Sequence, residues 1–242
     1  MINVAGFMAV MDHGITINWD DGPTLHKIAA QVRYHTGENA SSATLRLTAS
    51  QRYSDDPLTF MAMGGGLRAT WVWQERDPGW TAQLAVQNDG EEDVYIDSFD
   101  VIRIDFAFGG LFNIGAPPGL WQVASESAGL LPAPATMPAS TAYECWSAGS
   151  TTANGFTRNR ELIVQPSVSN RSRPPALMLR ALDTGAGMTT EIIVAVNGER
   201  FERAVARAKA DGMLIANGVI VASPEFWIVA GDDVDELRRL QM

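Results

Sequence analysis

The 242-residue chain predicts an all-β fold: an antiparallel β-sandwich with a long central loop region and a short C-terminal helix. Apolar and polar residues alternate along most of its length, as they do in strands with one buried face. Gly, Pro, Asn and Asp interrupt these runs at a spacing typical of sandwiches. Hydrophobic residues make up 46% of the chain and charged residues 19%, which suits a globular domain with a sizeable core.

The clearest predicted strands, residues 67–75 and 80–86, form a hairpin. An Asp-Pro-Gly turn joins them, because proline fixes φ and glycine tolerates positive φ. The apolar face of this hairpin carries three of the seven tryptophans, Trp71, Trp73 and Trp80. Large aromatic residues dominate sheet cores, so we favour core packing for all three. The alternative is a platform on which sugar rings stack.

The other predicted strands show the same alternation between turn residues. They comprise residues 15–19, 45–48, 93–105, 161–168, 176–182, 188–196 and 225–230. Residues 213–222 predict a second hairpin, because Asn217-Gly218 is a favoured two-residue turn pair. Residues 199–210 have strong helical propensity but also alternate from Arg203 onward, so helix and strand both fit this segment.

The middle of the chain, residues 106–160, is rich in Gly, Ala, Pro and Ser and predicts a long irregular region. Aromatic and charged side chains on a loop are better candidates for ligand contact than the same residues in strands. The candidates in this region are Trp121, Tyr143, Glu144, Trp146, Phe156, Arg158 and Arg160.

The end of the chain, residues 232–240, predicts a short helix. Asp232 or Asp233 can cap it, and its acidic residues come early and its basic residues late, as the helix dipole prefers. We expect residues 1–231 to form one sandwich domain and residues 232–242 a helix that can serve as a linker to a further domain.

Charge and cysteine content exclude several classes of protein. The formal net charge is −10 and the basic residues are scattered, whereas phosphate-backbone binding needs a clustered basic face, so we expect no nucleic-acid partner. Cys145 is the only cysteine, so no intrachain disulfide can form. The first residues lack a basic segment and reach Asp12 before any long apolar run. We therefore expect neither a signal peptide nor a membrane span, and a cytoplasmic location.

No catalytic motif is visible. GxSxG, HExxH and paired CxxC patterns are absent, and all three histidines fall within the first 35 residues without metal-site spacing. Carboxylate clusters such as Asp55-Asp56 fall mostly at turns or on polar strand faces, where solvated carboxylates are expected. We therefore predict no catalytic residue, no metal and no cofactor.

Three stretches together resemble the N-terminal domain of glycoside hydrolase family 36, the α-galactosidases and their relatives. They are WTAQLAVQNDGEEDVYIDSFDVIRID, FNIGAPPGLWQVASESAG and ADGMLIANGVIVASPEFWIVAGDDVDELRRL, within residues 67–240. The resemblance implies a β-supersandwich of the galactose-mutarotase-like kind, and it favours a strand for residues 199–210. In the family a following (β/α)₈ barrel holds both catalytic aspartates. A barrel needs about 250 residues, so neither aspartate has a matching position here.

The resemblance implies a non-catalytic module of a glycoside hydrolase that acts in carbohydrate binding, barrel docking or oligomer assembly. Its partners would be a carbohydrate or a glycosidase barrel domain, with a homo-oligomer possible and no membrane. Aromatic faces stack on sugar rings and polar side chains bind hydroxyls. We expect the ligand-binding residues to be Trp121, Trp146, Tyr143, Glu144, Arg158 and Arg160. The alternatives are a structural or assembly subunit without a sugar site, and a small self-sufficient epimerase or hydrolase.

Overall fold

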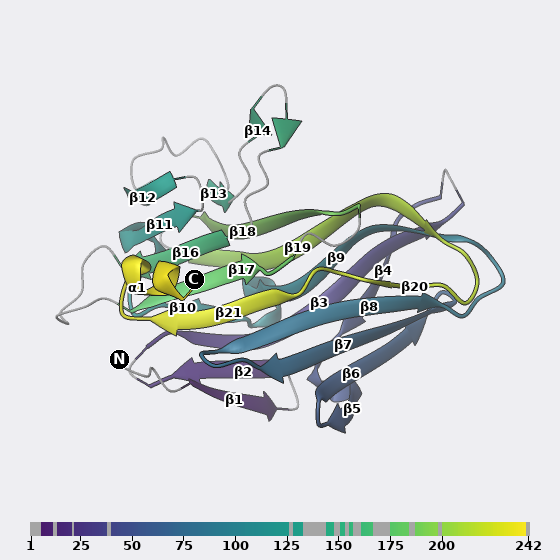
Figure 1. Cartoon of the computed structure of the whole chain (residues 1–242), viewed down its shortest axis with the longest axis horizontal. Helices are drawn as coiled ribbons and strands as arrows, with labels where there is room; N and C mark the ends of the chain where they lie inside the picture. Colours follow the sequence, from purple (N-terminus) through teal and green to yellow (C-terminus); the bar gives the residue numbers. More distant parts are fainter. Residues whose placement is uncertain are drawn as a thin grey trace.

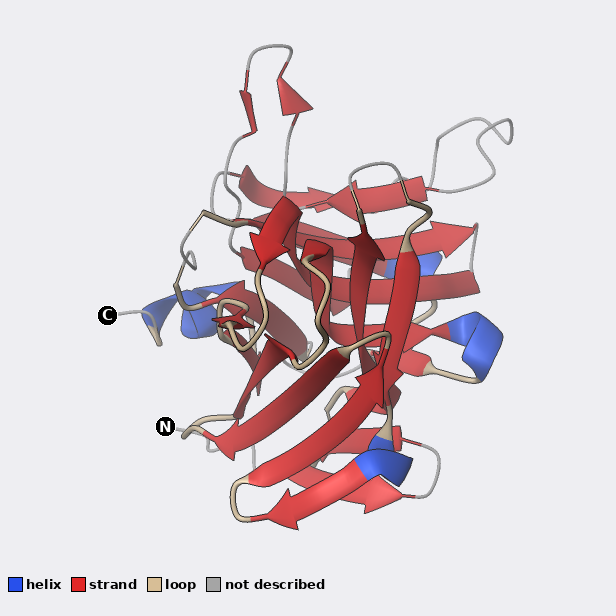
Figure 2. Ribbon diagram, turned by 90° about the vertical axis from the view of Figure 1, so that its right-hand side faces the viewer, coloured by secondary structure: helices blue, strands red, loops and turns tan. Residues whose placement is uncertain are grey.

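A computed structural model confirms the antiparallel β-sandwich, with two large sheets packed face to face (Figures 1 and 2). It describes residues 6–11, 14–20, 22–37, 40–125, 128–132, 144–147, 151–152, 155–156, 161–166, 175–183, 187–197 and 200–240. Among these residues, no helix is long and apolar enough to cross a membrane.

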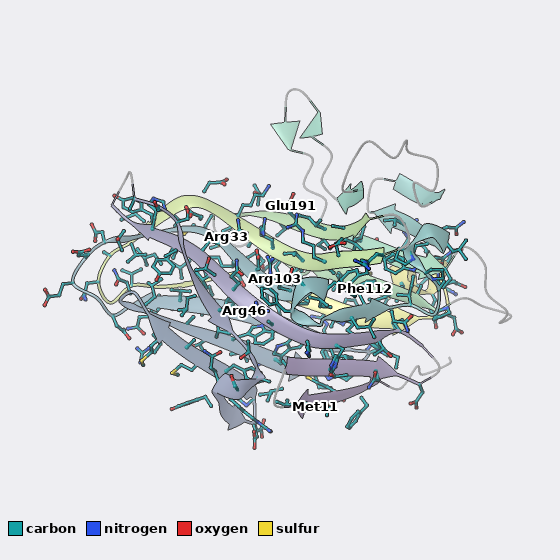
Figure 3. The ribbon with its side chains drawn as sticks, turned by 180° about the vertical axis from the view of Figure 1, so that it is seen from behind. Met11, Arg33, Arg46, Arg103, Phe112 and Glu191 are labelled. Carbon is teal, nitrogen blue, oxygen red and sulfur yellow. The ribbon has the colours of Figure 1, made fainter. Side chains whose placement is uncertain are left out.

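The first sheet, sheet I, has the strand order β1-β2-β3-β9-β19-β18-β13, and both β4 and β10 also pair with β3. Its strands are β1 Gly6–Met11, β2 Gly14–Trp19, β3 Thr24–Thr36, β4 Ala43–Leu47, β9 Val94–Asp105, β10 Leu111–Asn113, β13 Glu144–Ser147, β18 Thr189–Asn197 and β19 Arg200–Ile215. The outer face of sheet I is turned to the viewer in Figure 3.

The second sheet, sheet II, has the order β12-β11-β16-β17-β21-β8-β7-β6-β5, and β20 also pairs with β8. Its strands are β5 Arg52–Asp55, β6 Leu58–Gly64, β7 Leu67–Glu75, β8 Trp80–Asn88, β11 Trp121–Ser125, β12 Ala128–Pro132, β16 Glu161–Pro166, β17 Ala176–Ala181, β20 Ile220–Ala222 and β21 Phe226–Gly231. Short pieces complete the chain: β14 Thr151–Thr152, β15 Gly155–Phe156, the 3₁₀ turns η1 Ala49–Gln51, η2 Phe106–Phe108 and η3 Pro118–Leu120, and helix α1 Val234–Arg239.

The hairpin predicted for residues 67–75 and 80–86 is confirmed in β7 and β8, which pair from Leu67 opposite Asn88 to Glu75 opposite Trp80. Alternation places Trp71 and Trp73 in the core between the sheets, where they are 0% and 2% exposed. The preference for core packing is therefore confirmed for these two tryptophans. Trp80 lies at the start of its strand and is only partly buried.

Residues 200–210 belong to strand β19, so for the described part of the segment predicted over 199–210 the strand is confirmed and the helix is not formed. Its alanines at 204, 206, 208 and 210 are all buried on the core face. Neighbouring strands β9 and β18 supply the backbone hydrogen bonds on both sides of β19. Sheet pairing and burial of the apolar face therefore outweigh the helical propensity of this segment.

The hairpin predicted for residues 213–222 is wrong. β19 belongs to sheet I, whereas β20 pairs with β8 in sheet II. The turn itself exists: Gly218 has a φ of +75°, and the backbone N–H of Val219 donates to the Ala216 carbonyl at 3.1 Å. Gly218 also donates to the carbonyl of Asn88 at 2.7 Å, so the turn is fixed on the end of β8 and passes the chain from one sheet to the other.

The long irregular region predicted for residues 106–160 is also corrected, because the described part of it contains strands β10 to β15. β11 pairs with β16 over five residues, from Trp121 opposite Pro166 to Ser125 opposite Leu162. Pairing with a strand that is distant in sequence thus organises a segment whose composition suggests a loop.

Helix α1 is confirmed within the predicted range. The Asp233 carboxylate accepts a hydrogen bond from the backbone N–H of Glu236 at 2.8 Å, which is an N-cap. Val234 and Leu237 are buried in a small apolar cluster with Trp227, on the outer face of sheet II. The helix therefore packs directly on the sandwich. Its predicted role as a linker remains a prediction.

Candidate functional site

The structure assigns Trp121 to the core instead of an open sugar-binding face. Its side chain is 1% exposed, and its indole N–H donates to the carbonyl of Ala116 at 2.8 Å. The ring lies 5.5 Å from that of Phe112, with an interplanar angle of 52°. A sugar stacks on an exposed face of an aromatic ring. The Trp121 ring is almost fully covered by other residues of the chain, so the ligand-binding role expected for Trp121 does not fit its position.

The other candidates from the central region stay predictions. Glu144 and Trp146 lie in β13, opposite Val196 and Val194 of β18, and only their backbone is described. Tyr143, Arg158 and Arg160 fall outside the described residues, and only the backbone of Phe156, in β15, is described.

A different site lies where β1 and β5 run along the same side of the sandwich (Figure 1). It is a groove of about 510 Å³, which we call the Trp80 groove. It is lined by Met8, Asp55, Asp56, Pro57, Leu58, Trp73, Gln74, Glu75 and Trp80. The lining comes from β1, from the turn between β5 and β6, and from the two strand ends that flank the turn between β7 and β8.

Strand register brings these segments together. Leu58 pairs with Trp73 and Glu75 pairs with Trp80, so the β5–β6 turn and the β7–β8 turn lie at the same end of sheet II. Consecutive antiparallel strands place every second turn at the same end, which is why residues some 20 positions apart meet. The groove is therefore a direct product of the β5–β8 meander.

The orientation of the Trp80 ring is set by sheet I. Its ring contacts that of Trp19 edge-on, with centroids 5.6 Å apart. The backbone of Gly6 lies against the same ring, and a Cβ at that position would approach it to 2.4 Å. Trp80 is thus held between the two sheets while it still lines the groove.

The polar groups of the Trp80 groove are mainly acceptors. Asp55 forms an ion pair with Arg52. The side chains of Asp56 and Glu75 have no hydrogen-bond or ion-pair partner in the described part of the chain, and both residues are exposed. Carboxylate oxygens accept hydrogen bonds from hydroxyl groups, and an aromatic ring packs against the C–H face of a sugar. This combination suits a neutral, hydroxyl-rich ligand.

A second polar cluster occupies the outer face of sheet I, which we call the ionic network (Figure 3). Asp100 is fully buried there and accepts hydrogen bonds from Arg207 Nε and Nη2 and from Arg103 Nη1. Arg103 also donates to both carboxylate oxygens of Asp105, at 2.6 and 3.0 Å. Lys209 lies 3.1 Å from Glu191.

The arginines of the ionic network stay charged. Burial lowers the pKa of Arg207, but hydrogen bonding and charge attraction to Asp100 outweigh it, so the pKa lies above its ordinary value. The pKa of Arg103 is raised in the same way, with burial opposed by Asp105 and Asp100. A groove of about 550 Å³ next to the network includes Arg33 and Asp97. Since most of these charges are already paired within the chain, we interpret the ionic network as structural.

Sequence reasoning missed the Trp80 groove, although it had identified its parts. Asp55-Asp56 was assigned to a solvated turn and Trp80 to the core. The available signal was topological: in a meander of four strands, the first and third turns lie at one end. Two acidic turns flanking a tryptophan at that end would have indicated the groove.

The comparisons with known proteins support the fold. Neither a protein-family model nor a curated protein matches the chain. Among solved structures, the GH36 α-galactosidase AgaB from Geobacillus stearothermophilus aligns with a TM-score of 0.53 and 12% identity, over 84% of this chain and 30% of that protein. A variant of AgaA from the same organism, in complex with 1-deoxygalactonojirimycin, aligns at 0.49 and 11% identity, over 83% and 30%.

The galactosidase domain of the α-galactosidase-sucrose kinase AgaSK aligns at 0.47 and 9% identity, over 87% of this chain and 28% of that protein. The chain thus spans about 30% of the length of the AgaB structure. The AgaB alignment confirms the predicted resemblance in fold to a β-sandwich of GH36 α-galactosidases.

Proposed function

We propose that the chain is a non-catalytic, carbohydrate-binding β-sandwich module of the glycoside-hydrolase type, and that it binds a neutral sugar in the Trp80 groove. One observation carries the proposal: a partly buried tryptophan ring lines a groove of about 510 Å³ beside carboxylates that have no partner in the described part of the chain. The shared fold with part of an α-galactosidase supports the class of protein.

The chemistry of binding follows from the lining. One face of a pyranose presents C–H groups that pack on the indole of Trp80. Hydroxyl groups at the ring edge would donate to the carboxylates of Asp56 and Glu75, while Gln74 can both donate and accept. The groove is open to solvent, so we expect a dissociation constant of about a millimolar, which corresponds to about −4 kcal/mol.

The experiment is a titration with galactose, raffinose and an α-galactoside oligomer, followed by calorimetry and by ligand-observed NMR. Glu75→Ala and Asp56→Ala test the acceptors, because both side chains are exposed and their removal leaves the core intact. Glu92→Ala is the matched control, since Glu92 is an exposed carboxylate outside the groove.

We expect saturable binding to the wild type and to Glu92→Ala. Losing a hydrogen bond from a hydroxyl to a carboxylate costs about 1.5–3 kcal/mol, so each groove variant should weaken binding by about 10-fold or more. Trp80→Phe should also weaken it, because a smaller ring covers less of the sugar face. Absence of binding in the wild type, or equal binding in Glu75→Ala and Glu92→Ala, would refute the proposed site.

A further inference from the structure

Strand β1 is an edge strand that lacks the charges and prolines that usually prevent pairing with another chain. It lies at the end of sheet I, and within the described part of the chain it pairs only with β2. Its six residues, GFMAVM, contain neither a charge nor a proline. One end strand of sheet II, β5, has four residues and carries the Arg52–Asp55 ion pair. Natural proteins protect sheet edges with charges, proline or short strands, because an apolar edge pairs readily with another chain.

The register of the β1–β2 hairpin shows which backbone groups are free. Met11 pairs with Gly14, and the two strands are separated by two residues, so this closing pair is hydrogen-bonded. Pairs alternate along an antiparallel ladder, so Phe7, Ala9 and Met11 direct their N–H and C=O groups toward β2. Those of Met8 and Val10 point to the free edge.

The side chains of β1 add a symmetric pattern. Phe7 and Met11 are 64% and 55% exposed, and they lie two residues on either side of Ala9 on the same face of the strand. Met8 and Val10, on the other face, pack against the core. The exposed apolar pair is thus centred on Ala9.

We propose that two copies of this chain pair antiparallel along β1, with Ala9 opposite Ala9 of the partner, to form a two-fold dimer with one continuous sheet. In this register Met8 and the partner's Val10 form a hydrogen-bonded pair, as do Val10 and the partner's Met8. These are the residues whose backbone groups are free. Phe7 then lies opposite the partner's Met11, and Met11 opposite the partner's Phe7, in non-hydrogen-bonded pairs where cross-strand side chains approach most closely.

The occupant is a second copy because the pattern is self-complementary. A two-fold interface requires residue i to contact residue j while j contacts i, and Phe7 and Met11 satisfy this about Ala9. A thioether beside an aromatic ring is a favourable contact. Pairing also covers the β1 edge of each copy, so no third copy can add at β1.

Site-specific cross-linking tests the register. Ala9→Cys, made in a Cys145→Ser background, places two thiols opposite each other in a non-hydrogen-bonded pair, a separation that a disulfide can span. Phe7→Cys in the same background is the control, because its thiol would face the partner's Met11. We expect mild oxidation to give a covalent dimer with Ala9→Cys and little with Phe7→Cys.

Sedimentation velocity over a concentration series tests the dimer without cross-linking. The wild type should be dimeric, and Phe7→Lys and Met11→Glu should each weaken it by at least 10-fold, because charges would be buried in the interface. Mixing these two variants should restore a dimer, since opposite charges then meet at one contact. A wild type that stays monomeric at its highest soluble concentration would overturn the proposal, as would a dimer that Ala9→Cys does not cross-link.

Discussion

The ionic network of sheet I gives the most quantitative prediction. Asp100 is 0% exposed, and two guanidinium groups donate three hydrogen bonds to it. Asp100→Asn keeps the shape of the side chain and removes its charge. The amide oxygen can accept only the hydrogen bonds of the carboxylate oxygen whose place it takes, which are one at Oδ1 and two at Oδ2, while the NH₂ group faces donors and cannot accept from them. One or two of the three hydrogen bonds are therefore lost.

The expected cost follows from these contacts. A hydrogen bond to a charged group contributes about 1.5–3 kcal/mol, and breaking a buried ion pair costs about 3–5 kcal/mol. Arg103 keeps Asp105, so the lower part of this range applies, about 3 kcal/mol. With an urea m-value of about 2–3 kcal/mol/M, the unfolding midpoint should fall by about 1–1.5 M.

The assay is urea unfolding followed by tryptophan fluorescence, with Asp97→Asn as the matched control on the same strand. The Asp97 side chain is 30% exposed and pairs with His35, so its loss should cost less than about 1 kcal/mol. A midpoint shift for Asp100→Asn no larger than that for Asp97→Asn would refute the view that Asp100 anchors sheet I.

Three further predictions concern stability. Asp233→Ala removes the N-cap of α1 and should lower the free energy of unfolding by about 1 kcal/mol, measured by urea unfolding. Gly79→Ala should cost more than about 1 kcal/mol, because Gly79 has a φ of +96° and a Cβ there would lie 2.2 Å from the Ile228 carbonyl oxygen; thermal unfolding that matches wild type would contradict this. Since the pKa of Arg207 is raised above its ordinary value, its stabilising contribution is complete below the unfolded-state pKa and is lost only as pH rises through the higher folded value. The difference in urea midpoint between wild type and Arg207→Gln should thus be the same at about pH 7 and about pH 10.

The alternation of apolar and polar residues was sufficient to predict strands that pair with the next strand in sequence. The alternation from Leu67 to Glu75 predicted both the strand and the burial of Trp71. The same alternation was insufficient to predict which sheet a strand joins when its partner is distant in sequence. The Asn217-Gly218 turn is real, but no local signal shows that the strand after it joins the other sheet.

The candidate site shows the same division. Trp121 follows a Pro-Gly-Leu stretch that suggests an exposed loop, and only pairing of β11 with β16 buries it. Trp80 was identified as an aromatic of interest, but its groove depends on how β1 and the β5–β6 turn lie around it. Composition identifies the chemical groups, while sheet topology decides which of them meet a ligand.

Some strands pair with partners that are distant in sequence, and this affects the order in which the chain can fold during its synthesis. β8 and β9 follow each other in sequence but enter different sheets, where β8 pairs with β21 and β9 with β19. Ala82 meets Phe226 only after about 140 more residues have been made, which takes about 7–30 s at 5–20 residues per second. During that interval β8 lacks β21 and β9 lacks β19, so each strand keeps one edge without its final partner until the later strands have been made.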